Sequence, residues 1–157
     1  MMATARPDEK ATARTRARYQ RLASMYDRME GIAEGRYAPW RARLWSQVQG
    51  PAVLEVGVGT GKNMPYYPAG LHITAIDLTA GMLERAQKRA AALDLKADLQ
   101  LGDVQALSFP DASFDTAVAT FVFCSVPNPV SGLRELARVV KPGGRSYCSN
   151  TCVPPTG

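Results

Sequence analysis

The chain has 157 residues, of which 46% are hydrophobic, and it carries 19 Lys+Arg against 14 Asp+Glu. This length and composition fit one globular domain and exclude a disordered, collagen-like or disulfide-stabilised chain. The most apolar stretch, residues 116–126, is about half of the ~20 residues that a membrane-spanning helix needs, and the charged N-terminus lacks the apolar core of a signal peptide, so we expect a cytoplasmic chain.

Residues 8–30 are predicted to form an amphipathic helix. Its apolar residues recur every three or four positions, at Tyr19, Leu22, Tyr26 and Met29. A basic stripe borders them, formed by Arg14, Arg18, Arg21 and Arg28. Residues 1–49 hold the whole net charge of +5. Such a segment attracts an anionic membrane, nucleic acid or an acidic partner, or it covers a globular domain with its arginines in water.

Gly31, Gly35 and Pro39 predict a break after this helix, followed by a short helix over residues 40–48. From residue 51 onward, predicted strands alternate with predicted helices. The strands cover residues 52–56, 72–76, 97–101 and 114–123, and the helices cover residues 79–93 and 130–140. This alternation predicts an α/β fold with a doubly wound, mostly parallel sheet.

The predicted helix over residues 79–93 has the pattern of a surface helix with one buried side. Thr79 is a candidate N-cap, because a hydroxyl there can accept a bond from the first turn. The apolar face is expected to comprise Leu83, Ala86, Ala90 and Leu93.

Ligands of a doubly wound sheet bind beyond the carboxyl ends of the strands. A glycine-rich loop follows the first predicted strand, with the spacing G-x-G-x-G at Gly57, Gly59 and Gly61. Glycines allow a tight turn and a close approach of a ligand to the backbone. Position 62 is Lys62, whereas the dinucleotide fingerprint G-x-G-x-x-G needs a glycine there, so a pyrophosphate ligand is disfavoured.

Two acidic residues follow the next two predicted strands. Asp77 ends the second strand, where a carboxylate can accept both hydroxyls of a ribose. Asp103 ends the third strand, where its carboxylate can accept a bond from the exocyclic amine of adenine. Each alone fits an acidic turn residue. Together with the glycine loop they predict S-adenosylmethionine, an adenosine ligand without a pyrophosphate.

Four segments resemble the class I S-adenosylmethionine-dependent methyltransferases: VLEVGVGTGKN (53–63), ITAIDLTAGML (73–83), GDVQALSFPDASFD (102–115) and LARVVKPGG (136–144). The resemblance implies a doubly wound sheet of seven strands, with S-adenosylmethionine as cofactor and S-adenosylhomocysteine as product. It also implies the cofactor-binding residues Tyr26, Glu55, Gly57, Gly59, Gly61, Asn63, Asp77, Leu78, Met82, Asp103, Val104 and Thr120.

Other segments resemble one branch of this family, which includes quinone methyltransferases and bacterial phospholipid N-methyltransferases. Residues 23–27 resemble the branch's Ala-x-x-Tyr-Asp signature, in which the tyrosine closes over the cofactor. GKNMPYYP (61–68) and FVFCSVPNP (121–129) resemble the phospholipid subgroup, which methylates phosphatidylethanolamine stepwise to phosphatidylcholine, and also some thiol methyltransferases. A soluble methyltransferase of a quinone, thiol or other small molecule, and a non-catalytic membrane or nucleotide-binding module, remain alternatives.

With a phospholipid acceptor, Tyr19 and Tyr26 are candidates for positioning the amine, through a hydroxyl or a ring face; for Tyr19 ordinary core packing is an equal alternative. Arg14, Arg18, Arg21 and Arg28 then become candidate contacts with the inner face of the membrane, to which we expect peripheral association. No Asn/Asp-Pro-Pro-aromatic motif follows the fourth predicted strand, which disfavours nucleic acid as substrate. The three cysteines lack a metal-ligand spacing, so we expect no metal. We expect a monomer.

The domain organisation predicted from these patterns has three parts. Residues 1–49 form a basic helical segment that contacts the membrane and covers the active site, and residues 50–145 bind the cofactor. Residues 146–157, SYCSNTCVPPTG, depart from the apolar strand that the resemblance implies there. A shift of reading frame would explain the departure, since one permitted set of codons read two nucleotides later encodes an apolar run. We expect the sheet to be truncated after strand four or five.

Overall fold

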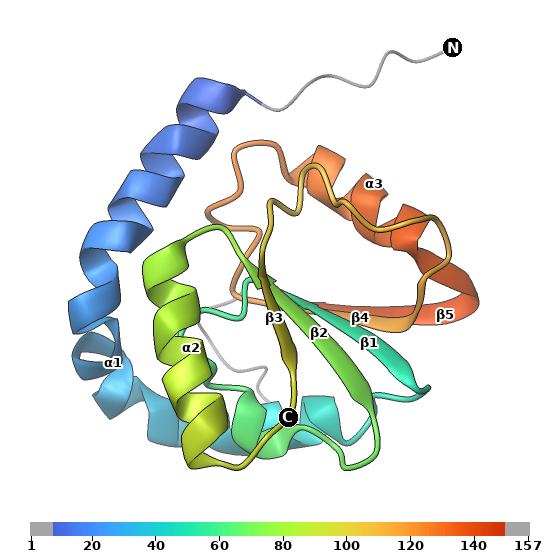
Figure 1. Ribbon diagram of the computed structural model, residues 1–157, viewed down its shortest axis with the longest axis horizontal. Coiled ribbons are helices and arrows are strands. Elements are labelled where there is room, and N and C mark those ends of the chain that lie inside the picture. The colour runs from blue at the N-terminus through green and yellow to red at the C-terminus, as the bar shows by residue number, and fades with distance from the viewer. Residues whose placement is uncertain (1–7, 150–157) are drawn as a thin grey trace.

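The computed structural model describes residues 8–149, except the side chains of residues 27, 29, 30, 32 and 33. Its sheet has five parallel strands in the order β3-β2-β1-β4-β5 (Figure 1). The strands are β1 (Ala52–Val56), β2 (His72–Asp77), β3 (Asp98–Leu101), β4 (Phe114–Thr120) and β5 (Val140–Ser149). Strand order reverses between β1 and β4, which confirms the predicted doubly wound topology.

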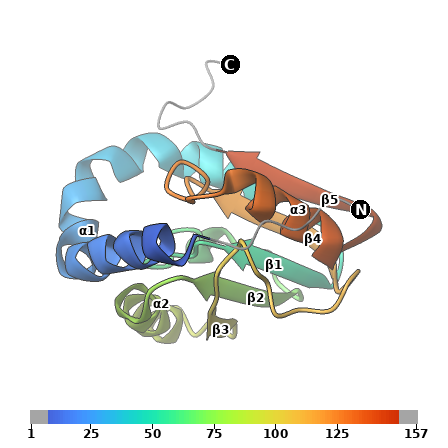
Figure 2. The ribbon, with the colours of Figure 1, turned by 90° about the horizontal axis from the view of Figure 1, so that it is seen from above.

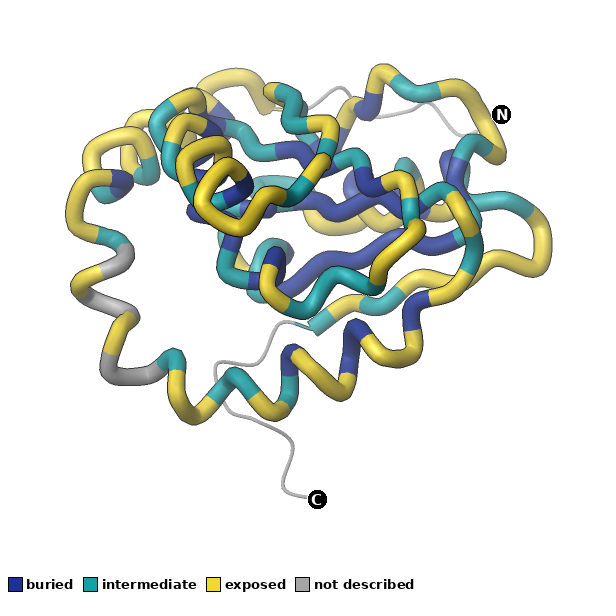
Figure 3. Tube along the Cα trace, turned by 60° about the horizontal axis from the view of Figure 1, so that its bottom comes forward, coloured by how far each residue is buried: buried dark blue, intermediate teal, exposed yellow. Residues whose placement is uncertain are grey.

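Helices cover both faces of the sheet (Figures 1 and 2). One face packs against the end of α1 (Glu9–Trp45), the 3-10 helix η1 (Met64–Tyr66) and α2 (Ala80–Ala92), and the other packs against α3 (Pro129–Val139). Side chains along β1 alternate between the two, as a strand buried on both sides requires. The central strands β1, β2 and β4 hold the buried residues of the sheet, which Figure 3 shows as the dark middle of the tube, whereas the edge strands β3 and β5 hold none.

The core explains why these strands form. Val53 of β1 packs with Trp45 on one face, whereas Leu54 packs with Leu136 on the other. All four side chains are at most 1% exposed. Burying an apolar side chain of this size stabilises the fold by roughly 1.5–3 kcal/mol. The apolar residues of β1 and β4 therefore favour the middle of the sheet, where both faces are covered.

The helix α2 confirms one predicted face and corrects two details. Leu83, Ala86 and Ala90 are buried against the sheet. Leu93, predicted on the same face, follows the end of the helix and is 44% exposed, because the chain turns away there. Thr79 occupies the N-cap position but its hydroxyl donates to Asp77 Oδ1 at 3.0 Å instead of accepting from the helix.

The predicted break in the N-terminal helix is wrong. α1 runs without interruption from Glu9 to Trp45, with Pro39 inside it, and begins at Asp8, whose side chain accepts bonds from the next backbone amides. The helix bends in its middle, so its first half lies beside α2 and its last turns pack on the sheet (Figures 1 and 2). Tertiary packing of Leu44 and Trp45 outweighs the low helix propensity of the glycines and proline.

The segment that departs from the family begins as a strand, which corrects the expectation that residues 146–157 contain none. Ser146 and Tyr147 of β5 pair with β4, and the Tyr147 hydroxyl donates to the Gln47 carbonyl at 3.0 Å. Backbone groups make this pairing, so small polar side chains at a half-exposed edge do not prevent it. Residues 150–157 lie outside the described part of the chain. Within residues 8–149, no helix is long and apolar enough to cross a membrane.

Candidate active site

A cavity opens at the carboxyl ends of β1, β2, β3 and β4, where the strand order reverses. About 970 Å³ of space not filled by atoms, a figure that includes open solvent, lies between its walls. Its lining brings together eleven of the predicted site residues: Tyr19, Tyr26, Gly57, Gly59, Asn63, Asp77, Leu78, Met82, Asp103, Val104 and Thr120. Glu55 and Gly61 lie behind this lining.

The glycine loop needs glycine for three different reasons. Gly57 has a φ of +67° and a Cβ there would lie 2.3 Å from Val122 Cγ2. Gly59, at φ +57°, would point a Cβ into open space, and its N–H donates to Asp77 Oδ2 at 2.9 Å. Gly61 packs against Met64, where a Cβ would approach the sulfur to 2.7 Å. The first two glycines therefore shape the cavity wall, and the third supports the loop from behind.

Asp77 is fixed in the wall by several donors. Besides Gly59, the backbone N–H and the hydroxyl of Thr79 donate to its Oδ1, both at 3.0 Å. Burial raises the pKa of this carboxyl, and the bonds from Thr79 and Gly59 oppose that rise. A carboxylate held in one orientation at a cavity wall is suited to accept hydroxyl groups of a ligand.

Gln105 is a buried cavity residue that the sequence analysis missed. Its backbone N–H donates to Asp103 Oδ1 at 2.9 Å, and its side-chain amide donates to both Asp103 oxygens and to the Thr12 hydroxyl, all at 3.1 Å. Its side-chain carbonyl accepts from the Asn128 backbone at 2.9 Å. Gln105 thus orients Asp103 and connects the loop after β3 to α1 and α3.

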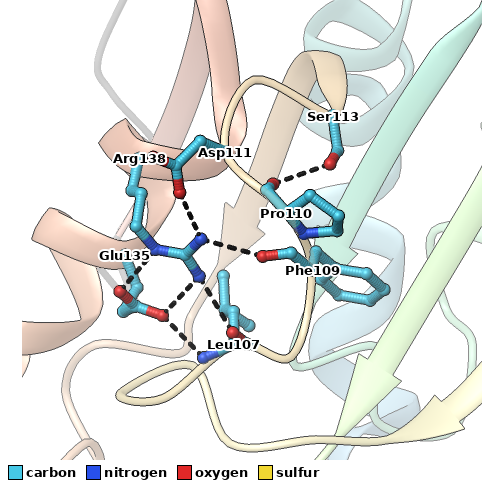
Figure 4. A network of polar contacts seen from close by, with 7 residues as sticks. All are labelled: Leu107, Phe109, Pro110, Asp111, Ser113, Glu135 and Arg138. Atoms are coloured by element: carbon cyan, nitrogen blue, oxygen red, sulfur yellow. Dashed lines mark hydrogen bonds and ion pairs between the residues drawn. The ribbon is translucent and has the colours of Figure 1, made fainter.

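The loop after β3 is anchored by Arg138 of α3 (Figure 4). Its guanidinium donates to the carbonyls of Leu107 and Phe109 at 2.9 and 2.8 Å and pairs with Asp111 and Glu135 at 2.8 Å. The Glu135 carboxylate in turn accepts the Leu107 N–H at 2.8 Å. This partly exposed network is structural, and it fixes the loop whose first residues form the cavity wall.

A buried polar network supports the opposite end of the cavity. Asn63 donates to Glu55 Oε1 at 2.6 Å and to Thr120 Oγ1 at 2.9 Å, and Tyr67 donates to the other Glu55 oxygen. Arg41 Nη1 donates to Asn63 Oδ1 at 2.6 Å. Burial raises the pKa of Glu55 to about 7, although the bonds from Tyr67 and Asn63 lower it.

The end of β4 forms an aromatic wall at the same end of the cavity. Phe121 has a φ of +59°, a strained conformation for a residue with a side chain. Its ring lies 5.2 Å from that of Tyr37 and 5.5 Å from that of Trp40, both on α1. Sequence reasoning missed this wall, since no local pattern joins residue 121 to the N-terminal helix.

α1 presents its two predicted stripes to different environments. Tyr19 and Tyr26 line the cavity, and Lys62 Nζ lies 5.5 Å from the centre of the Tyr26 ring. The basic stripe Arg14, Arg18, Arg21 and Arg28 is exposed to solvent, and Met25, 55% exposed, lies among these arginines. The side chain of Met29 lies outside the described residues. Tyr19 and Tyr26 of the apolar stripe therefore line the cavity, whereas the four arginines of the basic stripe are exposed.

Other reactive side chains lie away from the cavity. His72, the single histidine, is exposed at the first residue of β2, at the far end of that strand. Cys124 is exposed and does not line the cavity. In the part of the chain that the structure describes, no group of three or more His, Cys, Asp or Glu side chains is placed to hold a metal ion.

Comparison with known proteins connects this site to a family. Residues 54–148 match the family model described as a methyltransferase domain. A phosphatidylethanolamine N-methyltransferase of Cereibacter sphaeroides is 42% identical over 104 residues, which cover 65% of this chain and 51% of that protein. A demethylmenaquinone methyltransferase of Renibacterium salmoninarum is 37% identical over 145 residues, covering 89% of this chain and 57% of the relative. The chain spans about half the length of these relatives.

Solved structures support the same fold. A protein of Methanococcus maripaludis, described as an S-adenosyl-L-methionine-dependent methyltransferase, superposes with a TM-score of 0.74 at 20% identity, over 82% of this chain and 62% of that one. The chain therefore belongs to the methyltransferase-domain family and has the class I S-adenosylmethionine-dependent methyltransferase fold.

Proposed function

We propose that the chain transfers a methyl group from S-adenosylmethionine to a lipid acceptor. The observation that carries this proposal is the order of side chains along one cavity: the glycine loop, then Asp77, then Asp103 with Gln105. The residues fit the cofactor that the family implies, because Gly59 would point a Cβ into open space and both carboxylates are held at the wall. When bound, the cofactor supplies an electrophilic methyl group on a sulfonium.

The chain's own part in such a transfer is positioning and exclusion of water. Asp77 accepts the ribose hydroxyls, and Asp103, oriented by Gln105, accepts the adenine amine. Tyr19 and Tyr26 cover the cavity from α1, where a hydroxyl or ring face meets the acceptor. The acceptor ammonium must lose a proton before it attacks, and His72 does not line the cavity, because it lies at the first residue of β2 whereas the cavity opens at the carboxyl end of that strand. For an amine with a lysine-like pKa of ~10.4 this deprotonation costs roughly 4–5 kcal/mol at pH 7.

The acceptor that we favour is the amine of phosphatidylethanolamine and of its methylated intermediates, towards phosphatidylcholine. Two observations support it: the 42% identity to the Cereibacter relative, and the arginine stripe that faces solvent on the helix covering the cavity. A quinone acceptor is the second candidate, supported by the demethylmenaquinone methyltransferase that aligns over 89% of this chain.

The membrane is the proposed partner, contacted at its inner face. The exposed arginines attract an anionic surface by about 1 kcal/mol each, and Met25 adds an apolar contact between them. Replacing Arg14, Arg18 and Arg21 by Glu is expected to abolish sedimentation with vesicles of anionic phospholipid. The matched control carries the same charge change elsewhere, at the exposed Lys88, Lys96 and Arg134. Equal sedimentation of both variants contradicts the proposed membrane contact.

One assay separates the candidate functions. The chain is incubated with methyl-labelled S-adenosylmethionine and either vesicles containing phosphatidylethanolamine or a reduced demethylmenaquinone in detergent. Label in the phospholipid supports the favoured acceptor, and label in the quinone supports the second. A panel of thiols and other small nucleophiles is assayed in the same way, and if S-adenosylhomocysteine binds in calorimetry but no acceptor of the whole set is labelled, the result supports a non-catalytic binding module instead.

A further inference from the structure

The helix α1 contacts the cavity at two places that its bend separates. Tyr19 and Tyr26 reach the cavity from the first half, and Arg41 reaches it from the last turns. Hydrogen bonds from Gln105 Nε2 to the Thr12 hydroxyl and from the Gly81 N–H to Gln20 Oε1 hold the first half of the helix. The two halves point in different directions (Figure 1) but belong to one continuous helix, so the anchoring of the last turns acts together with these bonds to set how the first half lies over the cavity.

Arg41 is the charged anchor of those last turns. Its side chain is only 6% exposed, its Nε donates to Glu34 Oε1 at 3.0 Å and its Nη1 donates to Asn63 Oδ1 at 2.6 Å. The guanidinium carbon also lies 5.5 Å from the centre of the Phe121 ring. A buried guanidinium is tolerated only where its partners are in place, so this position of α1 is closely specified.

Asn63 connects Arg41 to two strands of the sheet, and we call this set of hydrogen bonds the junction. Its carbonyl oxygen accepts from Arg41 of α1, and its amide nitrogen donates to Glu55 of β1 and to Thr120 of β4. The residue is 3% exposed, so these bonds are shielded from water. One side chain therefore joins the covering helix to the ends of the two strands between which the cavity opens.

We propose that Arg41 and Asn63 are positioning residues that set how α1 closes over the bound cofactor. This inference rests on the proposed function, because it presumes that the cavity binds S-adenosylmethionine. It assigns Arg41 and Asn63 to holding the cofactor and not to a proton-transfer step. Without the junction, Tyr19 and Tyr26 lose their fixed place over the cavity. Cofactor affinity and turnover then fall together, while the cofactor contacts of Asp77 and Asp103 remain.

The test is a double-mutant cycle with Arg41→Ala, Asn63→Ala and the double variant. Removal of a buried bond to a charged group corresponds to roughly a 10- to 100-fold loss, so each single change is expected to weaken S-adenosylhomocysteine binding by about that factor. The double variant is expected to lose no more affinity than the single variant that binds more weakly, because both substitutions break the same Arg41–Asn63 contact. Arg43→Ala, an exposed arginine two residues along the same helix, is the control and keeps wild-type affinity.

A second measurement distinguishes closure from plain stability. Hydrogen exchange of the α1 amides over residues 9–26 is expected to accelerate in Arg41→Ala, while exchange in the last turns of α2, beyond the Gly81 contact with α1, stays unchanged. Arg41→Lys keeps the charge with fewer directed donors, and it is expected to restore part of the affinity. It also serves as the milder variant if Arg41→Ala does not fold.

The outcomes separate this inference from the proposed function. Failure of the wild-type chain to bind S-adenosylhomocysteine overturns both. If the wild type binds and the single variants bind equally well, only the positioning role is overturned. Additive losses in the cycle, or exchange that accelerates equally in α1 and α2, likewise overturn it.

Discussion

The two ends of the cavity are built in different ways. The adenosine end consists of residues that directly follow strands, so Gly59, Asp77 and Asp103 reach the cavity because their strands end there. The opposite end is assembled from segments far apart in the chain: Arg41 and Tyr26 of α1, Asn63 of the glycine loop, and Phe121 after β4. In the proposed function, the strand ends supply the cofactor site, whereas the covering helix supplies the part that meets the acceptor.

The largest expected effect is on the free energy of unfolding and comes from Glu55, the buried carboxylate at the end of the cavity that the helix covers. The pKa of Glu55 is about 7 in the folded chain against an ordinary value of 4.5. The folded state therefore binds more protons between these values, and the stability that this provides is lost as pH rises through 7. The free energy of unfolding is expected to fall by up to about 3 kcal/mol from pH 5 to pH 8 on this account.

Glu55→Gln removes this titration while keeping an oxygen that can accept the Asn63 amide. Urea unfolding of both proteins at several pH values between 5 and 8 measures the effect. The variant is expected to lose less stability over this range than the wild type. Parallel curves for the two proteins contradict the assignment of the titration to Glu55.

The next effect concerns the adenosine end. Asp77→Asn keeps the size of the side chain but removes the charge that accepts ribose hydroxyls. Affinity for S-adenosylhomocysteine is expected to fall roughly 30-fold, since hydrogen bonds to a charged group contribute about 1.5–3 kcal/mol. Calorimetry measures this loss against Asp94→Asn, a change at an exposed aspartate after α2. Equal affinities of the two variants remove Asp77 from the site.

A smaller effect is expected at Gln105, whose side chain bonds both to Asp103 and to Thr12 of α1, the helix that also reaches the opposite end of the cavity. Gln105→Ala leaves the Asp103 carboxylate without its side-chain donor and frees Thr12. We expect about a tenfold loss of cofactor affinity, together with faster hydrogen exchange in the first turns of α1. If affinity falls while exchange in α1 is unchanged, Gln105 serves the adenosine end alone.

The smallest expected effect is at Tyr19, and it shows whether this residue contacts the acceptor or the cofactor. Tyr19→Phe removes a hydroxyl and leaves the ring in the cavity wall. The kcat/KM for the acceptor is expected to fall about fivefold, which corresponds to about 1 kcal/mol for one lost hydrogen bond, with unchanged S-adenosylhomocysteine affinity. Steady-state kinetics at saturating cofactor provide the measurement. A loss in cofactor affinity instead would move Tyr19 to the adenosine end.

The two ends of the cavity also differ in how far they could be predicted from the sequence. The strands, the doubly wound sheet and the presence of Gly59, Asp77 and Asp103 at one cavity were predictable, because hydrophobic runs and the residues that end them are local features. The bonds from Gln105 to Thr12 and from Arg41 to Asn63 join positions 93 and 22 residues apart. No local pattern contains such pairs, and the uninterrupted α1 likewise depends on packing of its last turns against the sheet.

The position of α1 has a consequence for how such enzymes change during evolution. The family match begins at residue 54, after the whole of α1. The side chains that cover the cavity thus belong to a separate stretch of chain from the glycine loop and the two aspartates. Change within the first 50 residues therefore alters the side chains that cover the cavity, among them Tyr19 and Tyr26, while the glycine loop and the two aspartates stay as they are.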